Sequence, residues 1–155
     1  MEELNQIASF SVNHNTLLPG LYFSRQDGNV MTYDLRCKRP NTGDLLTNAQ
    51  MHSAEHLIAT LLRNSEHKDA VIYFGPMGCQ TGFYFLFDGN QLSHSQAIEL
   101  LQFVFAQGAT FTGDMPGYSA VECGNYINLD VACGKEVCRL YYNCIAEWTE
   151  PQLAY

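Results

Sequence analysis

The sequence predicts an α+β fold, in which helices pack on one face of an antiparallel or mixed sheet to form a single two-layer domain. Two observations support this prediction. Two early strand-like runs are joined by Asp27-Gly28, a dipeptide typical of a tight hairpin turn. Two later segments open with the Ser/Thr-x-x-Gln pattern of a helix capping box. Because the first strands pair as a hairpin, a doubly wound parallel sheet is disfavoured.

Four segments have the composition of strands. The hairpin joins Leu21–Arg25 to Val30–Arg36, and the second run alternates apolar side chains from Met31 to Cys37 with polar ones between them. The short apolar and aromatic runs Ala70–Phe74 and Gly82–Phe87 are expected to be buried strands on either side of a glycine-rich turn.

Three helices follow from capping and periodicity. The expected elements are a helix Asn48–Asn64 with Thr47 and Gln50 as its capping box, a helix from the box of Ser93 and Gln96 to about Gly108, a loop at Phe111–Tyr118, and a last helix Leu129–Trp148. No repeat, linker or low-complexity run interrupts residues 1–155, so one domain is expected.

The composition limits the possible partners. The chain has 155 residues, a formal net charge of −8, 46% hydrophobic residues and only 15% charged residues. Nucleic acids and anionic membranes are bound by clustered Lys and Arg, so neither is expected as a partner. The low charged fraction suggests an apolar surface that meets another subunit. No run approaches the roughly 18 apolar residues of a membrane span.

The cysteines and the first residues predict a cytoplasmic protein. Met1–Phe10 contains two glutamates and lacks the basic and apolar regions of a signal peptide. In a reducing compartment the 6 cysteines are expected to be free thiols, available as ligands or nucleophiles. None of them forms a CxxC pair, which disfavours a structural zinc knuckle.

The first expected helix carries an H-x-x-E-H pattern. His52 and His56 are separated by four residues, so both imidazoles lie on one helix face and can share one divalent ion. Glu55 lies on the same arc as an acid/base group, and the small Ala59 leaves space for a substrate.

The third ligand is open between a cysteine and a distant carboxylate. Cys123 is the stronger cysteine candidate, because it follows an irregular stretch and precedes Gly124, which allows close approach of the backbone. The remaining cysteines of the second strand and the last helix are expected to be packing thiols: Cys37, Cys133, Cys138 and Cys144. Cys79, in the glycine-rich turn Gly75–Gly82, is equally compatible with a reactive thiol and with a residue that only fills the turn.

Three motifs in order resemble the S-ribosylhomocysteine lyase family, the autoinducer-2 synthesis enzymes of bacteria. They are HSAEHL at 52–57, PMGCQTGFY at 76–84 and Cys123-Gly124, and the second is the most specific. Further matches are Ser9-Phe10 with Asn13-His14, and YDLR at 33–36 ahead of Pro40-Asn41. The resemblance runs from about Ser9 into the last helix.

The resemblance implies a reaction and a set of residues. S-ribosylhomocysteine would be cleaved to homocysteine and 4,5-dihydroxy-2,3-pentanedione by aldose–ketose isomerisation and β-elimination, in a homodimer with active sites at the subunit interface. The cofactor would be Fe²⁺, replaceable by Zn²⁺ or Co²⁺. By position, His52, His56 and Cys123 match the metal ligands, Glu55 and Cys79 the acid/base residues, and Ser9, His14, Arg36 and Arg63 the residues that contact substrate.

The chain departs from the family pattern at three places. Leu17–Arg25 is about two residues longer than usual, Tyr73 stands where many members carry an acid that helps hold the amino-acid end, and Leu129 replaces a common histidine.

Two other functions fit parts of the sequence. An inverted-type metallopeptidase also uses H-x-x-E-H, and would take Glu122 or Glu147 as its third ligand. A non-catalytic, metal-stabilised interaction domain would need neither Glu55 nor Cys79.

Overall fold

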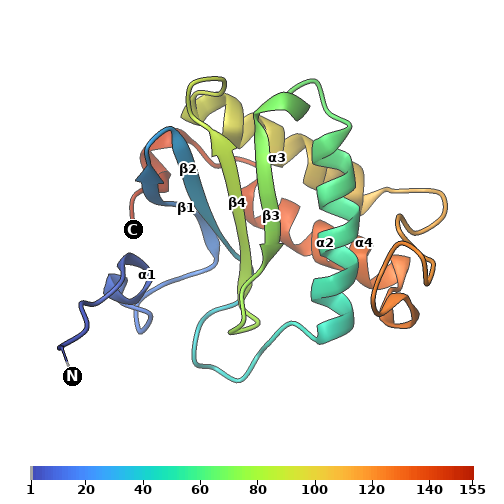
Figure 1. The fold of residues 1–155 in the computed structure, drawn as a ribbon, viewed down its shortest axis with the longest axis horizontal. Helices are drawn as coiled ribbons and strands as arrows, with labels where there is room; N and C mark the ends of the chain where they lie inside the picture. The colour runs from blue at the N-terminus through green and yellow to red at the C-terminus, as the bar shows by residue number, and fades with distance from the viewer. Residues whose placement is uncertain (1) are drawn as a thin grey trace.

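The computed structural model describes residues 2–155 and has an α+β architecture, as the sequence predicts (Figure 1). The strands are β1 (Gly20–Asp27), β2 (Val30–Arg36), β3 (Val71–Pro76) and β4 (Gly82–Asp88), in the order β1-β2-β4-β3 with every neighbouring pair antiparallel. The helices are α1 (Ala8–Ser11), α2 (Asn48–Arg63), α3 (His94–Ala109) and α4 (Val131–Ile145), with short 3-10 helices at Lys68–Ala70, Tyr126–Asn128 and Glu150–Leu153.

The predicted hairpin is present. β1 and β2 pair antiparallel, with Asp27 opposite Val30, and Gly28 has a φ of 61° in the turn between them. Only glycine adopts this left-handed conformation without steric cost, which explains the Asp-Gly signal. The observed strand β1 is longer than the predicted Leu21–Arg25 by one residue at its start and two at its end.

Both predicted capping boxes form. The Thr47 hydroxyl accepts a hydrogen bond from the Gln50 backbone N–H at 3.1 Å, and the Gln50 side chain accepts one from the Thr47 N–H at 2.8 Å. Ser93 and Gln96 make the same reciprocal pair at the start of α3. These bonds satisfy backbone donors that have no partner inside the helix, and so define where each helix begins.

One face of the sheet and three helices share the hydrophobic core. Phe83, Phe85 and Phe87 alternate along β4 and are fully buried. They belong to the same buried cluster as Leu57 and Ile58 of α2, together with side chains of α3 and α4. In Figure 1, α3 and α4 lie behind the sheet and α2 lies beside β3. The opposite face of α2 is therefore left for chemistry.

The last helix is shorter than the predicted Leu129–Trp148. It starts at Val131 because the Asp130 side chain accepts a hydrogen bond from the Ala132 N–H at 2.8 Å and caps the helix. It ends at Ile145, and a new capping box at Thr149 then begins a 3-10 helix. The Asp130 cap therefore excludes the first predicted residues from the helix, and the separate 3-10 helix follows its earlier end.

Two other features were not predicted. Helix α1 and the 3-10 helices are too short to produce a periodic sequence signal. The second face of β2 is also covered, because Asp34 and Arg36 are only 1% and 3% exposed. Among residues 2–155, none of the helices has the length and apolarity needed to cross a bilayer.

The start of α2 provides the first testable prediction. Thr47→Ala removes the capping hydroxyl and is expected to lower the free energy of unfolding of the metal-free protein by about 1 kcal/mol. Thr47→Ser keeps the hydroxyl and is the matched control. Urea denaturation followed by circular dichroism measures both variants. Equal stability of Thr47→Ala and the wild type would mean that this box does not determine the start of α2.

Candidate metal centre and active site

Three predicted ligands converge beside α2. His52, His56 and Cys123 offer ligand atoms that all lie within 4.8 Å of one another. The Cys123 Sγ lies 3.3 Å from His52 Nε2, and the two imidazole rings stand 4.7 Å apart and nearly perpendicular. All three are half-buried. The i, i+4 spacing on α2 brings the histidines together, and the long loop before α4 brings the thiol.

The outer nitrogen of each histidine is already engaged. His52 Nδ1 bonds the side-chain oxygen of Asn128, and His56 Nδ1 lies 2.9 Å from the carbonyl oxygen of Pro116. An oxygen acceptor requires that Nδ1 carry the proton, so each neutral imidazole directs the lone pair of Nε2 elsewhere. Two imidazole nitrogens and one thiolate are a donor set suited to a tetrahedral divalent ion with one open position. The residues present therefore fit a metal ion.

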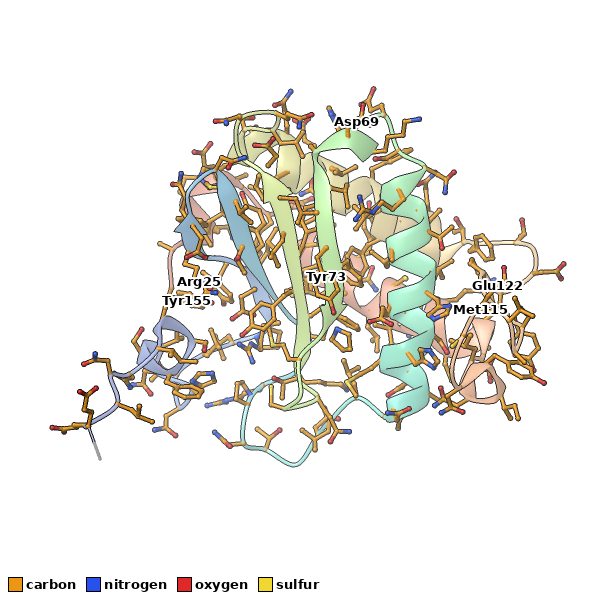
Figure 2. The ribbon with its side chains drawn as sticks, viewed as in Figure 1. Arg25, Asp69, Tyr73, Met115, Glu122 and Tyr155 are labelled. Atoms are coloured by element: carbon orange, nitrogen blue, oxygen red, sulfur yellow. The ribbon has the colours of Figure 1, made fainter. Side chains whose placement is uncertain are left out.

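The loop over the metal ligands depends on a glycine. Gly117 has a φ of 72°, and a Cβ at this position would lie 2.7 Å from His56 Nδ1. Without a side chain, the backbone can pass directly over the imidazole and present the Pro116 carbonyl to it. Figure 2 shows this loop, labelled at Met115 and Glu122, beside α2.

A groove runs from His56 along α2 to β3. It has a volume of about 430 Å³ and is lined by Glu55, His56, Ala59, Arg63 and Tyr73, among others. Glu55 and the small Ala59 therefore line the same groove as His56. Arg63 at the far end donates hydrogen bonds to two carbonyl oxygens of β3, at 2.6 and 2.8 Å.

Tyr73 narrows this groove from the β3 side. Its side chain is 53% exposed and lies against Gly75, where a Cβ would overlap the Tyr73 hydroxyl. Residues two apart on a strand share a face, so the bare Gly75 creates the space that the ring occupies. The groove thus presents a phenol at the position where the resemblance described above led us to expect an acid.

Cys79 belongs to a second cluster. An Arg36 nitrogen, Nη1, lies 3.8 Å from Cys79 Sγ and 2.8 Å from Thr81 Oγ1, and the Cys79 and Thr81 side chains are 3.1 Å apart. Arg36 is held by Asp34 through two hydrogen bonds, at 3.1 and 2.6 Å. Burial lowers the pKa of Arg36, but the hydrogen bonds and charge of Asp34 outweigh it and raise the pKa overall, so the guanidinium stays charged.

The remaining cysteines behave as packing thiols. Burial raises the pKa of the Cys138 thiol to about 12, and the pKa values of Cys37, Cys133 and Cys144 are also raised, first of all by burial. Thiols that resist ionisation are poor ligands and poor nucleophiles. This agrees with the prediction made for them from the sequence.

The structure separates the predicted site residues into three groups. Glu55 and Arg63 line the same groove as His56, one of the three candidate metal ligands, while Arg36 lies with Cys79. Ser9 lies on α1, and His14 follows it in a turn, where its Nδ1 lies 2.8 Å from the Val12 carbonyl oxygen. α1 lies at the β1 side of the sheet and α2 at the β3 side (Figure 1). Within residues 2–155, no hydrogen bond or ion pair joins the groups.

Several functional contacts were missed from the sequence. Asn128 and Pro116 are 76 and 60 residues away from the histidines that they contact, so no local pattern points to them. Asp34 was detectable, because it precedes Arg36 by two residues on the same strand face. Glu122, the alternative third ligand, instead accepts a hydrogen bond from Ser119 Oγ at 2.6 Å.

Comparison with known proteins identifies relatives along nearly the whole chain. A family model for S-ribosylhomocysteinase (LuxS) matches residues 7–152. An S-ribosylhomocysteine lyase of Clostridium beijerinckii is 43% identical over 158 residues, and one of Desulfotalea psychrophila is 46% identical over 160 residues; each alignment covers 98% of this chain and 99% of the relative. One of Finegoldia magna is 40% identical over 156 residues, with the same coverage.

The contact between Asn128 and His52 provides a second prediction. Asn128→Ala frees the His52 ring to rotate and is expected to weaken divalent-metal binding about 10- to 100-fold. Asn48→Ala is the matched control, because it removes only the 2.7 Å bond that the Asn128 amide donates to Asn48. Zinc titration of the metal-free protein against a competing chelator measures both. An unchanged zinc affinity in Asn128→Ala would show that the contact does not orient the ligand.

Proposed function

The chain belongs to the S-ribosylhomocysteinase (LuxS) family, and from this premise we infer which of its residues carry out the family reaction. The resemblance found in the sequence is confirmed, and the function is that of an S-ribosylhomocysteine lyase. It cleaves S-ribosylhomocysteine to homocysteine and 4,5-dihydroxy-2,3-pentanedione. The observation that supports a working site most directly is the convergence of His52, His56 and Cys123 beside a groove lined by Glu55.

The substrate explains why proton-transfer groups are needed. Homocysteine is attached as a thioether at C5 of the ribose, and the neighbouring C4 proton is not acidic in the starting sugar. Moving the carbonyl along the sugar to C3 acidifies that proton, after which β-elimination expels homocysteine as a thiolate. Each shift of the carbonyl needs one group that removes a proton from carbon and one that returns it to the next carbon.

The metal-binding residues are His52, His56 and Cys123, with Fe²⁺ as the ion and Zn²⁺ or Co²⁺ as substitutes. Their donor set and the engaged outer nitrogens support this assignment. When bound, the ion supplies Lewis-acid polarisation of the sugar oxygens. The groove beside it then holds the rest of the substrate, with Glu55 close to the sugar and Arg63 at the distant end.

Glu55 and Cys79 are the two acid/base residues. Glu55 lies between the two histidines in sequence and on the same arc of α2, so its carboxylate reaches the groove from one side. Cys79 is exposed in its turn, and the charged guanidinium of Arg36 close to its sulfur is a suitable partner for a thiolate. Each group removes or returns protons on its own side of the sugar. Tyr73, in place of an acid, changes the contacts available to the amino-acid end.

The separation of these residues supports a homodimer with sites at the subunit interface. The groove with Glu55 lies beside β3, whereas Ser9 and His14 lie at the β1 edge, and Cys79 and Arg36 form a cluster of their own. A second copy related by two-fold symmetry brings the Cys79 group of one protomer to the groove of the other, and completes two sites at once. Ser9, His14 and Arg36 then contact the substrate from the opposite protomer. The six free cysteines suit a reducing cytoplasm.

Thiol release tests the activity and the two assignments together. The iron-loaded protein incubated with S-ribosylhomocysteine is expected to release free thiol, detectable with a chromogenic disulfide. Glu55→Gln and Cys79→Ala are expected to bind the metal normally and to lower turnover about 100-fold or more, the usual contribution of a positioned acid/base group. Loss of metal in either variant would show that its residue helps hold the ion instead.

Mixed dimers test the shared site. Co-expression of Glu55→Gln and Cys79→Ala chains with different tags yields a dimer in which one site carries both substitutions and the other carries none. About half of the wild-type activity is expected to return, because one of two sites is intact. The matched control pairs Glu55→Gln with Cys123→Ser, which damages both sites and restores nothing. An inactive Glu55→Gln/Cys79→Ala dimer would place both residues in one protomer's site.

A further inference from the structure

The Asp34–Arg36 ion pair beside Cys79 lies almost entirely out of water. Asp34 is 1% exposed and Arg36 is 3% exposed. Two nitrogens of Arg36, Nε and Nη2, bind the two oxygens of Asp34, and the third, Nη1, is left to reach Thr81 and Cys79. The plane of the Asp34 carboxylate therefore determines where Nη1 lies relative to the Cys79 sulfur.

A third donor fixes that carboxylate. The Tyr155 hydroxyl donates a hydrogen bond to Asp34 Oδ2 at 2.7 Å, on the same oxygen that accepts from Arg36 Nη2. A buried carboxylate needs its lone pairs satisfied, and the phenol meets this need from outside the sheet. Burial first, and then the charge of Asp34, raise the pKa of Tyr155, so the hydroxyl remains protonated and able to donate.

The ring of Tyr155 is also held in place. It stacks on Tyr22 of β1 with ring centroids 5.0 Å apart and an interplanar angle of 15°. Tyr22 is itself anchored, because its hydroxyl donates to the Leu18 carbonyl oxygen at 2.9 Å. In Figure 2, Tyr155 lies on the β1 side of the molecule, away from the loop labelled at Met115 and Glu122. Tyr155 is thus remote from the His52, His56 and Cys123 cluster, and its hydroxyl reaches the Cys79 cluster through Asp34. Its side chain also lines a pocket with Val12 and Asn13, next to His14.

We propose that Tyr155 is a positioning residue, which acts through Asp34 and Arg36 to hold the guanidinium against the Cys79 sulfur. The inference rests on the proposed catalytic role of Cys79. Without the hydroxyl, the Asp34 side chain loses one of its three hydrogen bonds and can rotate, and Arg36 Nη1 moves away from the sulfur. The thiolate is then less stabilised and the thiol less reactive.

Thiol alkylation tests the proposal independently of turnover. In the metal-loaded protein without substrate, Tyr155→Phe keeps the stacked ring and removes only the hydroxyl. Iodoacetamide is expected to alkylate Cys79 about threefold to tenfold more slowly than in the wild type, the effect of one hydrogen bond in a charged network. Cys133 is the internal reference, and peptide mass spectrometry measures both rates in one sample. Tyr22→Phe is the matched control, because its hydroxyl binds a different acceptor and its ring still stacks.

Each outcome decides one question. The proposal is supported if Tyr155→Phe lowers the alkylation rate of Cys79 and leaves that of Cys133 unchanged, while Tyr22→Phe keeps both wild-type rates. In that case kcat for S-ribosylhomocysteine should fall by a similar factor in Tyr155→Phe, with KM nearly constant. The proposal is overturned if Cys79 is alkylated at the wild-type rate in Tyr155→Phe, or if Tyr22→Phe lowers the Cys79 alkylation rate equally. If Cys79→Ala retains turnover, the catalytic role of Cys79 fails, whereas the alkylation result still decides whether Tyr155 positions Arg36.

Discussion

The period of helix α2 is the constraint on which the rest of the molecule depends. With 3.6 residues per turn, one helix places Leu57 and Ile58 in the core and leaves His52 and His56 on the other side. The same packing that stabilises the fold therefore directs two imidazoles outward at the spacing of one shared ion. The capping box at Thr47 defines where the helix starts, and therefore the position along the helix axis at which these side chains lie beside β3. Core and site cannot be changed separately here.

Hydrogen bonds connect the loop before α4 to helix α2, and connect the turn with Cys79 to the segment just before α2. Asp130 donates its N–H to the buried Ser53 hydroxyl of α2 at 2.9 Å, which fixes the end of the loop that carries Cys123. The turn with Cys79 is bound to the segment before α2, because Leu46 and Gln80 exchange hydrogen bonds at 2.9 and 3.0 Å. Gln80 has a φ of 64°, a conformation that costs energy outside glycine and that these bonds sustain.

Two electrostatic environments result. The groove beside α2 combines a metal-binding cluster with a carboxylate, whereas the covered face of the sheet isolates an ion pair and directs one guanidinium nitrogen to a thiol. A buried ion pair stabilises a fold weakly, since desolvation offsets its attraction. The buried Asp34–Arg36 pair instead determines which guanidinium nitrogen lies beside the Cys79 sulfur. In the function that we propose, the groove, the neighbouring His52, His56 and Cys123 group, and the thiol cluster supply the acid, the base and the Lewis-acid site of the lyase reaction.

The local rules of the chain determined a large part of this molecule in advance. The Asp27-Gly28 hairpin, both capping boxes and the shared face of His52 and His56 follow from interactions over two to four residues, which a sequence displays directly. Composition and spacing singled out Cys123 and Cys79 as candidates, and the family resemblance assigned them the roles of metal ligand and acid/base residue. Only the tertiary structure decided which groups orient the metal ligands, that Tyr155 reaches Asp34 across 121 residues, and that Cys79 lies apart from the groove. These contacts depend on how sheet and loops close over long separations, and no local pattern encodes that closure.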